Sequence, residues 1–144
     1  MDTIDLEIKA SADWVSRALL GSGYRADFSP QSLLEIERFF KEHSQDGVGK
    51  PGGLLVKDVG KRLFGLGSYM GEVVRLNKGG LWIFYEPDTR GDVCIELCLP
   101  DGQRCWPIQY AIQRIKYGAE NSVVSWAIDL GLQIRSEPEP EVEA

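Results

Sequence analysis

The sequence predicts an α+β fold in one domain, with three N-terminal helices, a three-stranded antiparallel meander and two C-terminal helices. Apolar residues recur at helical spacing near both ends of the chain, whereas residues 81–106 show the aromatic runs and period-two alternation of strands. The 144 residues are 43% hydrophobic and 26% charged, as in ordinary globular proteins. One hydrophobic core is therefore expected for residues 1–136.

The first two helices are predicted from their caps and apolar spacing. The first begins at Ser11 or Asp13 and ends near Leu20, before the glycines of residues 21–23. Four of its residues are spaced to share a face: Trp14, Val15, Ala18 and Leu19. The second helix has Ser29 as its N-cap and Pro30 in its first position. Its apolar stripe is Leu33, Ile36, Glu37 and Phe40, and its water-facing side is Glu35, Arg38, Lys41 and Glu42.

The end of the second helix raises two functional questions. His43, the only histidine, falls in the last turn, where a helix C-terminus favours a cation, so a capping or surface role is favoured over catalysis. Residues 45–53 are a loop by composition. The Gly49-Lys50 pair in this loop does not make a phosphate loop, because Pro51 follows it and a helix, not a strand, precedes it.

A long third helix is predicted from Leu54 to about Lys78, where two glycines end it. At about 100° per residue, a stripe roughly 40° wide holds Gly53, Gly60, Gly67 and Gly71. Each interior glycine costs about 0.5–1 kcal/mol relative to alanine, so we expect this stripe to admit a closely packed backbone, with a ligand groove as the alternative. Gly65, about 140° from the stripe, is expected to tolerate a side chain. The arc expected to face water holds Lys57, Lys61, Ser68, Glu72 and Arg75.

The middle of the chain predicts the meander. Residues 81–85 form an aromatic strand, residues 86–92 a hairpin loop, and residues 93–99 a half-buried strand. The turn Leu99-Pro-Asp-Gly102 is typical of a three-residue hairpin with a bulge, which sets Cys98 opposite Arg104 on a short return strand. A two-residue turn would set Cys98 opposite Cys105 instead. Pro107 then opens a helix that stops at Gly118, and Asn121 or Ser122 caps the last helix.

The charge excludes some partners. The chain has 16 Lys and Arg against 22 Asp and Glu, a net charge of −6, which argues against nucleic acid or an anionic membrane. Residues 137–144 alternate Pro and Glu and are expected to be a disordered acidic tail, with mimicry of an acidic ligand as the alternative. No apolar run approaches the roughly 20 residues of a membrane span, and residues 1–10 lack the pattern of a signal peptide. A cytoplasmic protein is therefore expected.

The three cysteines and His43 could in principle bind zinc. Cys94 and Cys98 lie about 13 Å apart along one predicted strand, whereas sulfurs on one zinc ion lie within about 4 Å. Cys105 is expected on the buried face and the other two on the opposite face. We therefore expect no metal site, no disulfide and no cofactor. No nucleophile elbow or zinc-protease motif is present. Catalysis by two carboxylates that converge in space stays an alternative, because the chain has 22 Asp and Glu residues.

One motif resembles a known group of proteins. Gly67-Ser-Tyr-Met-Gly-Glu-Val73 on a long helix, with Trp82 in the next strand, resembles an uncharacterised family of small bacterial cytoplasmic proteins. The resemblance covers residues 28–130 and implies a bacterial protein of no known activity. It directs attention to Tyr69, Glu72 and Trp82, and Arg75 lies three residues beyond Glu72. We expect Tyr69 and Glu72 to share a polar side, and Ser68, Glu72 and Arg75 to tie the helix to the sheet, with a recognition site as the alternative.

Two functional hypotheses follow. The first is a non-enzymatic protein-binding domain, such as an immunity or accessory factor for another bacterial protein, since the chain is small and acidic and has no catalytic motif. The second is a small enzyme or ligand-binding protein with a pocket near Tyr69 and Glu72. Binding of another protein is the expected partnership, and homodimerisation is left open.

Overall fold

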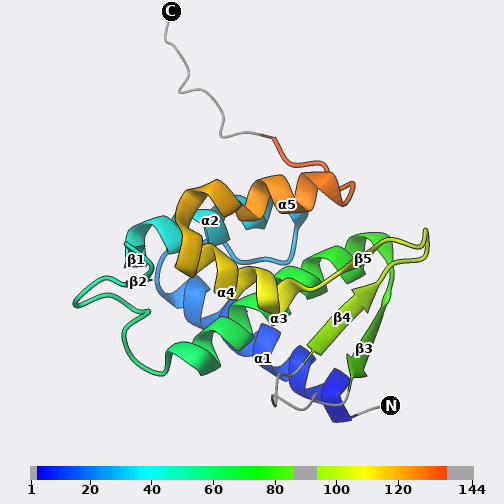
Figure 1. Ribbon diagram of the computed structural model, residues 1–144, viewed down its shortest axis with the longest axis horizontal. Coiled ribbons are helices and arrows are strands. Elements are labelled where there is room, and N and C mark those ends of the chain that lie inside the picture. Colours follow the sequence, from blue (N-terminus) through cyan, green and yellow to red (C-terminus); the bar gives the residue numbers. More distant parts are fainter. Residues whose placement is uncertain (1–2, 86–93, 136–144) are drawn as a thin grey trace, which may run out of the picture.

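The computed structural model describes residues 3–85 and 94–135, and it confirms the single α+β domain (Figure 1). The predicted hairpin loop and acidic tail lie outside the described residues. The helices are α1 (Thr3–Gly21), α2 (Leu33–His43), α3 (Val59–Lys78), α4 (Pro107–Tyr117) and α5 (Val123–Asp129), with short 3-10 turns at Pro30–Ser32 and Gly118–Asn121. The strands are β1 (Ser44–Gln45), β2 (Val48–Gly49), β3 (Leu81–Tyr85), β4 (Cys94–Cys98) and β5 (Arg104–Cys105).

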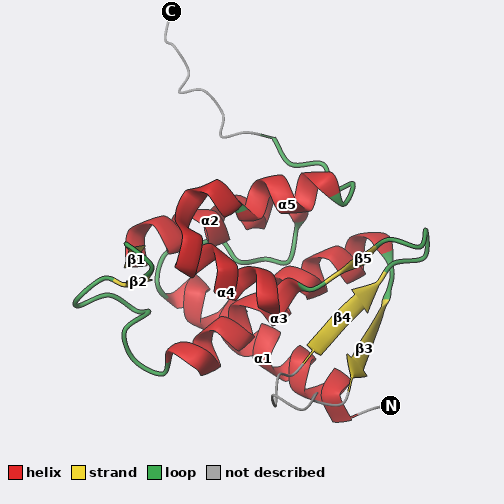
Figure 2. Cartoon of the chain, viewed as in Figure 1, coloured by secondary structure: helices red, strands yellow, loops and turns green. Residues whose placement is uncertain are grey.

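Helix α3 lies at the centre of the fold. It packs against α1 and α4, while α2 packs against α5. Figure 2 shows strands β3 to β5 together at one end of a mainly helical molecule. The middle of α3 has no exposed side, because every residue from Leu63 to Val74 except Phe64 is buried.

Several predicted boundaries are confirmed. The Ser29 hydroxyl accepts a hydrogen bond from the Ser32 N–H at 3.1 Å, so the second helical segment begins as expected, with a 3-10 turn before α2. Pro107 is the first residue of α4. Ser122 caps α5, accepting hydrogen bonds from the next helical N–H groups. In each case a local capping rule decides where the helix starts.

The predicted starts of two helices are wrong. Helix α1 begins at Thr3 rather than Ser11, and its buried stripe is Ile8, Ala12, Val15 and Leu19. Helix α3 begins at Val59 rather than Leu54, after Asp58 in a left-handed conformation at φ 53°. In the segment before the helix, Leu55 is fully buried.

The hairpin register is confirmed. Strands β4 and β5 pair with Cys98 opposite Arg104 and Leu97 opposite Cys105. The Gly102 N–H donates to the Leu99 carbonyl at 3.0 Å, and Gly102 has the positive φ of 93° that the turn requires. The inner face of the sheet therefore carries the apolar residues of β4, as predicted, but Glu96 on the other face is also buried, with 1% of its surface exposed.

This register leads to a prediction about thiol reactivity. Cys105 is buried, and desolvation raises the pKa of its thiol to about 12, whereas Cys94 and Cys98 are partly exposed. Since the thiolate is the reactive form, brief alkylation of the native protein should label Cys94 or Cys98 before Cys105. Mass spectrometry of the digested protein measures the order. Labelling of Cys105 first would contradict the register, because a shift of one residue exchanges the two faces of a strand.

The glycine stripe is partly confirmed. A side chain at Gly67 would collide with the main chain of Ile108, and one at Gly71 with the Trp82 ring, so α4 and β3 approach α3 at these two positions. Gly60 has no neighbouring atom within 4 Å. The expectation for Gly65 is wrong, because its Cβ would lie 2.6 Å from Val15 Cγ2, where α1 crosses α3.

The prediction that one arc of α3 faces water is also wrong in part. Ser68 is fully buried, and Glu72 has only 4% of its surface exposed, whereas Lys57 and Lys61 are exposed as expected. The arc is buried because α3 is covered on several sides by α1, α4 and the sheet, so its polar residues need partners inside the protein.

Candidate functional site

Three of the four predicted site residues form one cluster between α3 and β3. Arg75 donates two hydrogen bonds to the Glu72 carboxylate, from Nε at 2.7 Å and from Nη2 at 2.9 Å. The Trp82 indole N–H donates to the same carboxylate at 2.8 Å. The expected tie between the helix and the sheet is therefore present through Glu72, Arg75 and Trp82, while the Ser68 hydroxyl has no hydrogen-bond partner among the described residues.

The cluster holds Glu72 in its ionised form. Burial alone would raise the pKa of Glu72, but the hydrogen bonds from Arg75 and Trp82 outweigh burial, and the pKa lies below its usual range. Both carboxylate oxygens accept hydrogen bonds from these side chains. A carboxylate occupied in this way fastens β3 to α3 and is poorly placed to abstract a proton from a substrate.

Tyr69 lies in a different environment. Its hydroxyl accepts a hydrogen bond from the Phe28 N–H at 2.8 Å and lies 2.7 Å from the Ser32 hydroxyl. Burial is the main cause that raises its pKa, and none of its surface is exposed. Tyr69 therefore anchors the segment before α2 to α3, and the structure does not bring it together with the carboxylate of Glu72.

Two buried carboxylates were missed as pairs by the sequence analysis. Glu37, on α2, pairs with Arg114 on α4 at 2.8 Å and also accepts the Val123 N–H at the start of α5. Glu96, on β4, pairs with Arg104 at 2.6 Å and accepts the Tyr85 hydroxyl at 3.0 Å. The sequence contained one sign of such a pair, because Glu37 lies within the apolar stripe of its helix. Glu37 joins elements that are distant in sequence, whereas Glu96 joins the three successive strands of the sheet.

His43 ends α2 as predicted and holds the next loop. Its Nδ1 accepts the Leu54 N–H at 3.1 Å, and its ring packs on Phe39 with centroids 4.6 Å apart. Burial lowers the pKa of His43, with a smaller opposing effect of Glu42. Within residues 3–85 and 94–135, no group of three or more His, Cys, Asp or Glu side chains is arranged to hold a metal ion. No described helix is long and apolar enough to cross a membrane.

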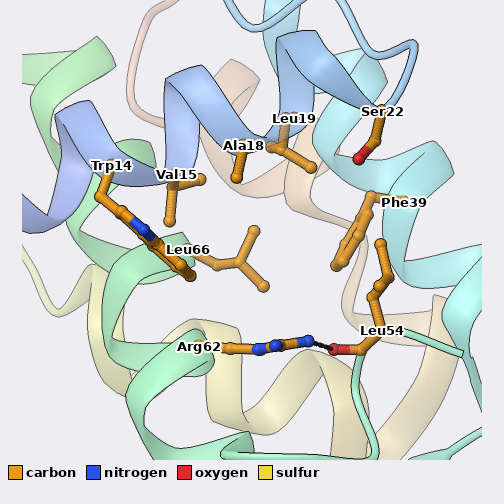
Figure 3. A pocket seen from close by; sticks show the side chains of 9 residues that line it. All are labelled: Trp14, Val15, Ala18, Leu19, Ser22, Phe39, Leu54, Arg62 and Leu66. Carbon is orange, nitrogen blue, oxygen red and sulfur yellow. Dashed lines mark hydrogen bonds between the residues drawn. The ribbon is translucent and has the colours of Figure 1, made fainter.

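A cavity of about 150 Å³ opens between α1, α2 and α3 (Figure 3). Most of its walls are apolar side chains, and its one charged group is the Arg62 guanidinium, which donates to the Leu54 carbonyl at 2.5 Å. The predicted shared face of α1 forms one wall, although Trp14 is 43% exposed rather than buried. The lining residues are Trp14, Val15, Ala18, Leu19, Ser22, Phe39, Leu54, Arg62 and Leu66.

Two wider concavities are lined in part by charged side chains. One, of about 850 Å³, lies beside the segment before α2, where Arg38 pairs with Glu35 at 2.8 Å. The other, of about 530 Å³, lies between β5, α4 and α5 and is lined in part by Trp106, Tyr110 and Trp126. Neither is lined by any of the four predicted site residues.

Strand β3 presents an edge. The sheet order is β3-β4-β5, so among the described residues β3 pairs with a strand on one side only. The Leu99 N–H donates to the Gln103 carbonyl, so the main-chain N–H and carbonyl groups of the odd-numbered residues of β4 point toward β5. Those of the even-numbered residues of β4 therefore point toward β3. Residues 81, 83 and 85 pair with those even-numbered residues, so Trp82 and Phe84 direct their main-chain N–H and carbonyl groups to the outer edge.

No protein family, curated protein or solved structure matches this chain. The resemblance based on the Gly-x-Tyr-x-Gly-Glu-Val motif therefore stays a prediction.

The place of β3 at the edge of the sheet and the cavity were also not predicted from the sequence. Aromatic residues in 81–85 predicted a strand but not its place at the edge of the sheet. The cavity depends on the packing of α1, α2 and α3, and its cation, Arg62, comes from a helix that was predicted to start five residues earlier. Neither feature has a local motif that could have revealed it.

Proposed function

We propose that the protein is a non-enzymatic protein-binding domain, of the immunity or accessory type, which recognises an extended segment of another protein at the edge of β3. The observation that carries this proposal is the exposure of an apolar edge strand. Leu81 is 72% exposed, Phe84 42% and Tyr85 38%. Natural edge strands are usually protected by charge, proline or a covering element, and none of residues 81–85 is charged or a proline.

The edge defines the chemistry of the partner. The main-chain N–H and carbonyl groups of Trp82 and Phe84 can form hydrogen bonds with an added strand, and these bonds supply affinity. The side chains at alternate positions of β3 supply specificity. Leu81, Ile83 and Tyr85 lie on one face of β3, so the partner strand is expected to place apolar side chains beside them. The partner is therefore an extended, largely apolar segment.

The alternative, a small enzyme or ligand-binding protein with a pocket near Tyr69 and Glu72, has no observation in its favour. The Tyr69 hydroxyl bonds to Phe28 and Ser32, and the Glu72 carboxylate bonds to Arg75 and Trp82. These groups act as internal connections of the fold. A binding function therefore accounts better for the exposed surface than chemistry at these residues does.

The experiment compares partner capture by edge variants. Leu81→Lys places a charge on the exposed face, and Phe84→Pro removes an outward N–H without removing a bond to β4. We expect wild type to capture a protein from a lysate of the source organism. Both variants should capture at least tenfold less of this protein. Quantitative mass spectrometry of the captured fraction measures the loss.

Matched controls separate the edge from general exposure. Ile128→Lys charges another exposed apolar site, on α5, and Phe84→Ala shortens the side chain but keeps the N–H. Both should retain the captured protein. Equal capture by all variants would refute the proposal, as would sedimentation showing that wild type pairs with a second copy through β3, because the strand partner would then be this chain itself.

A further inference from the structure

We infer that the cavity between α1, α2 and α3 binds a small carboxylate that carries an apolar chain of about six carbons or a single ring. Its walls come mainly from Trp14, Val15, Leu19, Phe39 and Leu66 (Figure 3). The volume of about 150 Å³ is large enough for a benzene-sized group, and a ligand can enter from solvent because the lining residues Trp14 and Leu54 are 43% and 40% exposed.

Arg62 selects an anion. Its side chain makes one hydrogen bond, to the Leu54 carbonyl, and pairs with no carboxylate of the described residues. A guanidinium has five N–H donors in a planar fork, and the bond to Leu54 uses one of them. A carboxylate can accept two of these bonds at once, which is the geometry that arginine recognises best. In Figure 3 the Arg62 side chain lies along one side of the cavity, with its guanidinium directed toward Leu54.

The segment of the chain that carries Arg62 is also rich in positive charge. Residues 50–62 contain four cations, Lys50, Lys57, Lys61 and Arg62, against one acid, Asp58, although the chain as a whole is acidic. Arg62 lies in the first turn of α3, whose N-terminus carries a partial positive charge. The Asp58 side chain makes no capping hydrogen bond there. The cavity therefore has an apolar interior beside a locally positive segment.

The volume limits the size of the ligand. Binding should strengthen about fourfold for each methylene that enters the cavity, since each buried methylene contributes about 0.8 kcal/mol. We expect this gain to continue from acetate to about hexanoate and then to level off, because longer chains extend into solvent. A ligand with so few atoms should bind with a dissociation constant on the order of 1 mM.

The test is an NMR titration of the ¹⁵N-labelled protein with hexanoate, using hexanol and acetate as comparisons. Each tryptophan contributes one indole N–H signal, and the chain has four. We expect hexanoate to shift the Trp14 signal, assigned with Trp14→Phe, and to leave the Trp82 signal in place. Hexanol should bind about tenfold more weakly, because it lacks the charge, and acetate should not saturate, because it lacks the chain.

Two variants make the assignment specific. Arg62→Gln keeps a donor for the Leu54 carbonyl but removes the charge, so the affinity for hexanoate should fall about tenfold while that for hexanol is unchanged. Ala18→Leu fills the cavity and should abolish binding of both compounds, with a thermal melt confirming that it folds. Equal binding of hexanoate and hexanol, or binding that survives Ala18→Leu, would overturn the inference, as would the absence of any shift at Trp14. None of these readouts depends on β3.

Discussion

Replacing Gly67 or Gly71 with leucine should destabilise the protein by about 3 kcal/mol, the upper end of the usual cost of overpacking and the largest effect we expect from single substitutions on α3. At Gly67 the new side chain would meet the main chain of Ile108, which cannot rotate away. At Gly71 it would enter the space of the Trp82 ring, whose indole bonds to Glu72. The free energy of unfolding, measured in urea, tests both variants.

Gly60→Ala is the matched control on the same helix. No atom lies within 4 Å of the position that its Cβ would take, and alanine favours the helix by about 0.5–1 kcal/mol over glycine. We therefore expect this variant to be as stable as wild type or more stable. If Gly60→Ala and Gly67→Leu gave similar losses, close packing at Gly67 would not be the cause.

The second large effect is expected at the buried pair of Glu37 and Arg114. Arg114→Leu leaves the Glu37 carboxylate buried without its cation, and we expect a loss of about 3–5 kcal/mol in the free energy of unfolding. Only 6% of Glu37 and 2% of Arg114 is exposed, so solvent cannot replace the missing partner. Chemical denaturation monitored by circular dichroism measures the loss.

The double variant Glu37→Leu with Arg114→Leu separates the pair from the packing. It removes both charges together, so it should be more stable than Arg114→Leu alone, although the Val123 N–H loses its acceptor. Arg38→Met is the surface control, because its partners Glu35 and Glu42 are on the exposed side of α2, and it should cost less than about 1 kcal/mol. Equal losses in Arg38→Met and Arg114→Leu would contradict the account.

Local rules predicted much of the fold. Serine and proline caps placed the starts of three helical segments, and the Leu99-Pro-Asp-Gly102 turn placed the register of β4 and β5 correctly. These features depend on hydrogen bonds and dihedral angles within a few residues. A single sequence contains all of the information that they need.

Other features depend on tertiary packing. The first turns of α1 carry Ile4, Leu6 and Ile8 alternating with polar residues, a pattern that resembles a strand, and helix formation there is decided by packing of Ile8 against the core. Glu37 and Arg114 are 77 residues apart, so no local spacing links them. Ser68 and Glu72 are buried because other elements pack around several sides of α3. Helical periodicity does not indicate how many sides of a helix are covered.

The candidate site was predicted in part. The link between Glu72, Arg75 and the sheet follows from a spacing of three residues on a helix and was expected. The separation of Tyr69 from that cluster was not, because the Tyr69 hydroxyl bonds to Phe28 and Ser32, which lie 41 and 37 residues before it in the sequence. Helical arithmetic gives the direction of a side chain but not the element that it meets.

The position of Glu37 has a consequence for synthesis on the ribosome. Its acceptor groups are satisfied by residues that follow much later, the last of them the Val123 N–H, 86 residues downstream. At roughly 5–20 residues per second, the chain waits roughly 4–17 s between translation of Glu37 and of Val123. During that time the Glu37 carboxylate has neither Arg114 nor the Val123 N–H as a partner, so its burial is unfavourable. A nascent chain that ends before α4 therefore cannot complete its core. Folding of this domain is therefore expected to be completed only after α5 has been made.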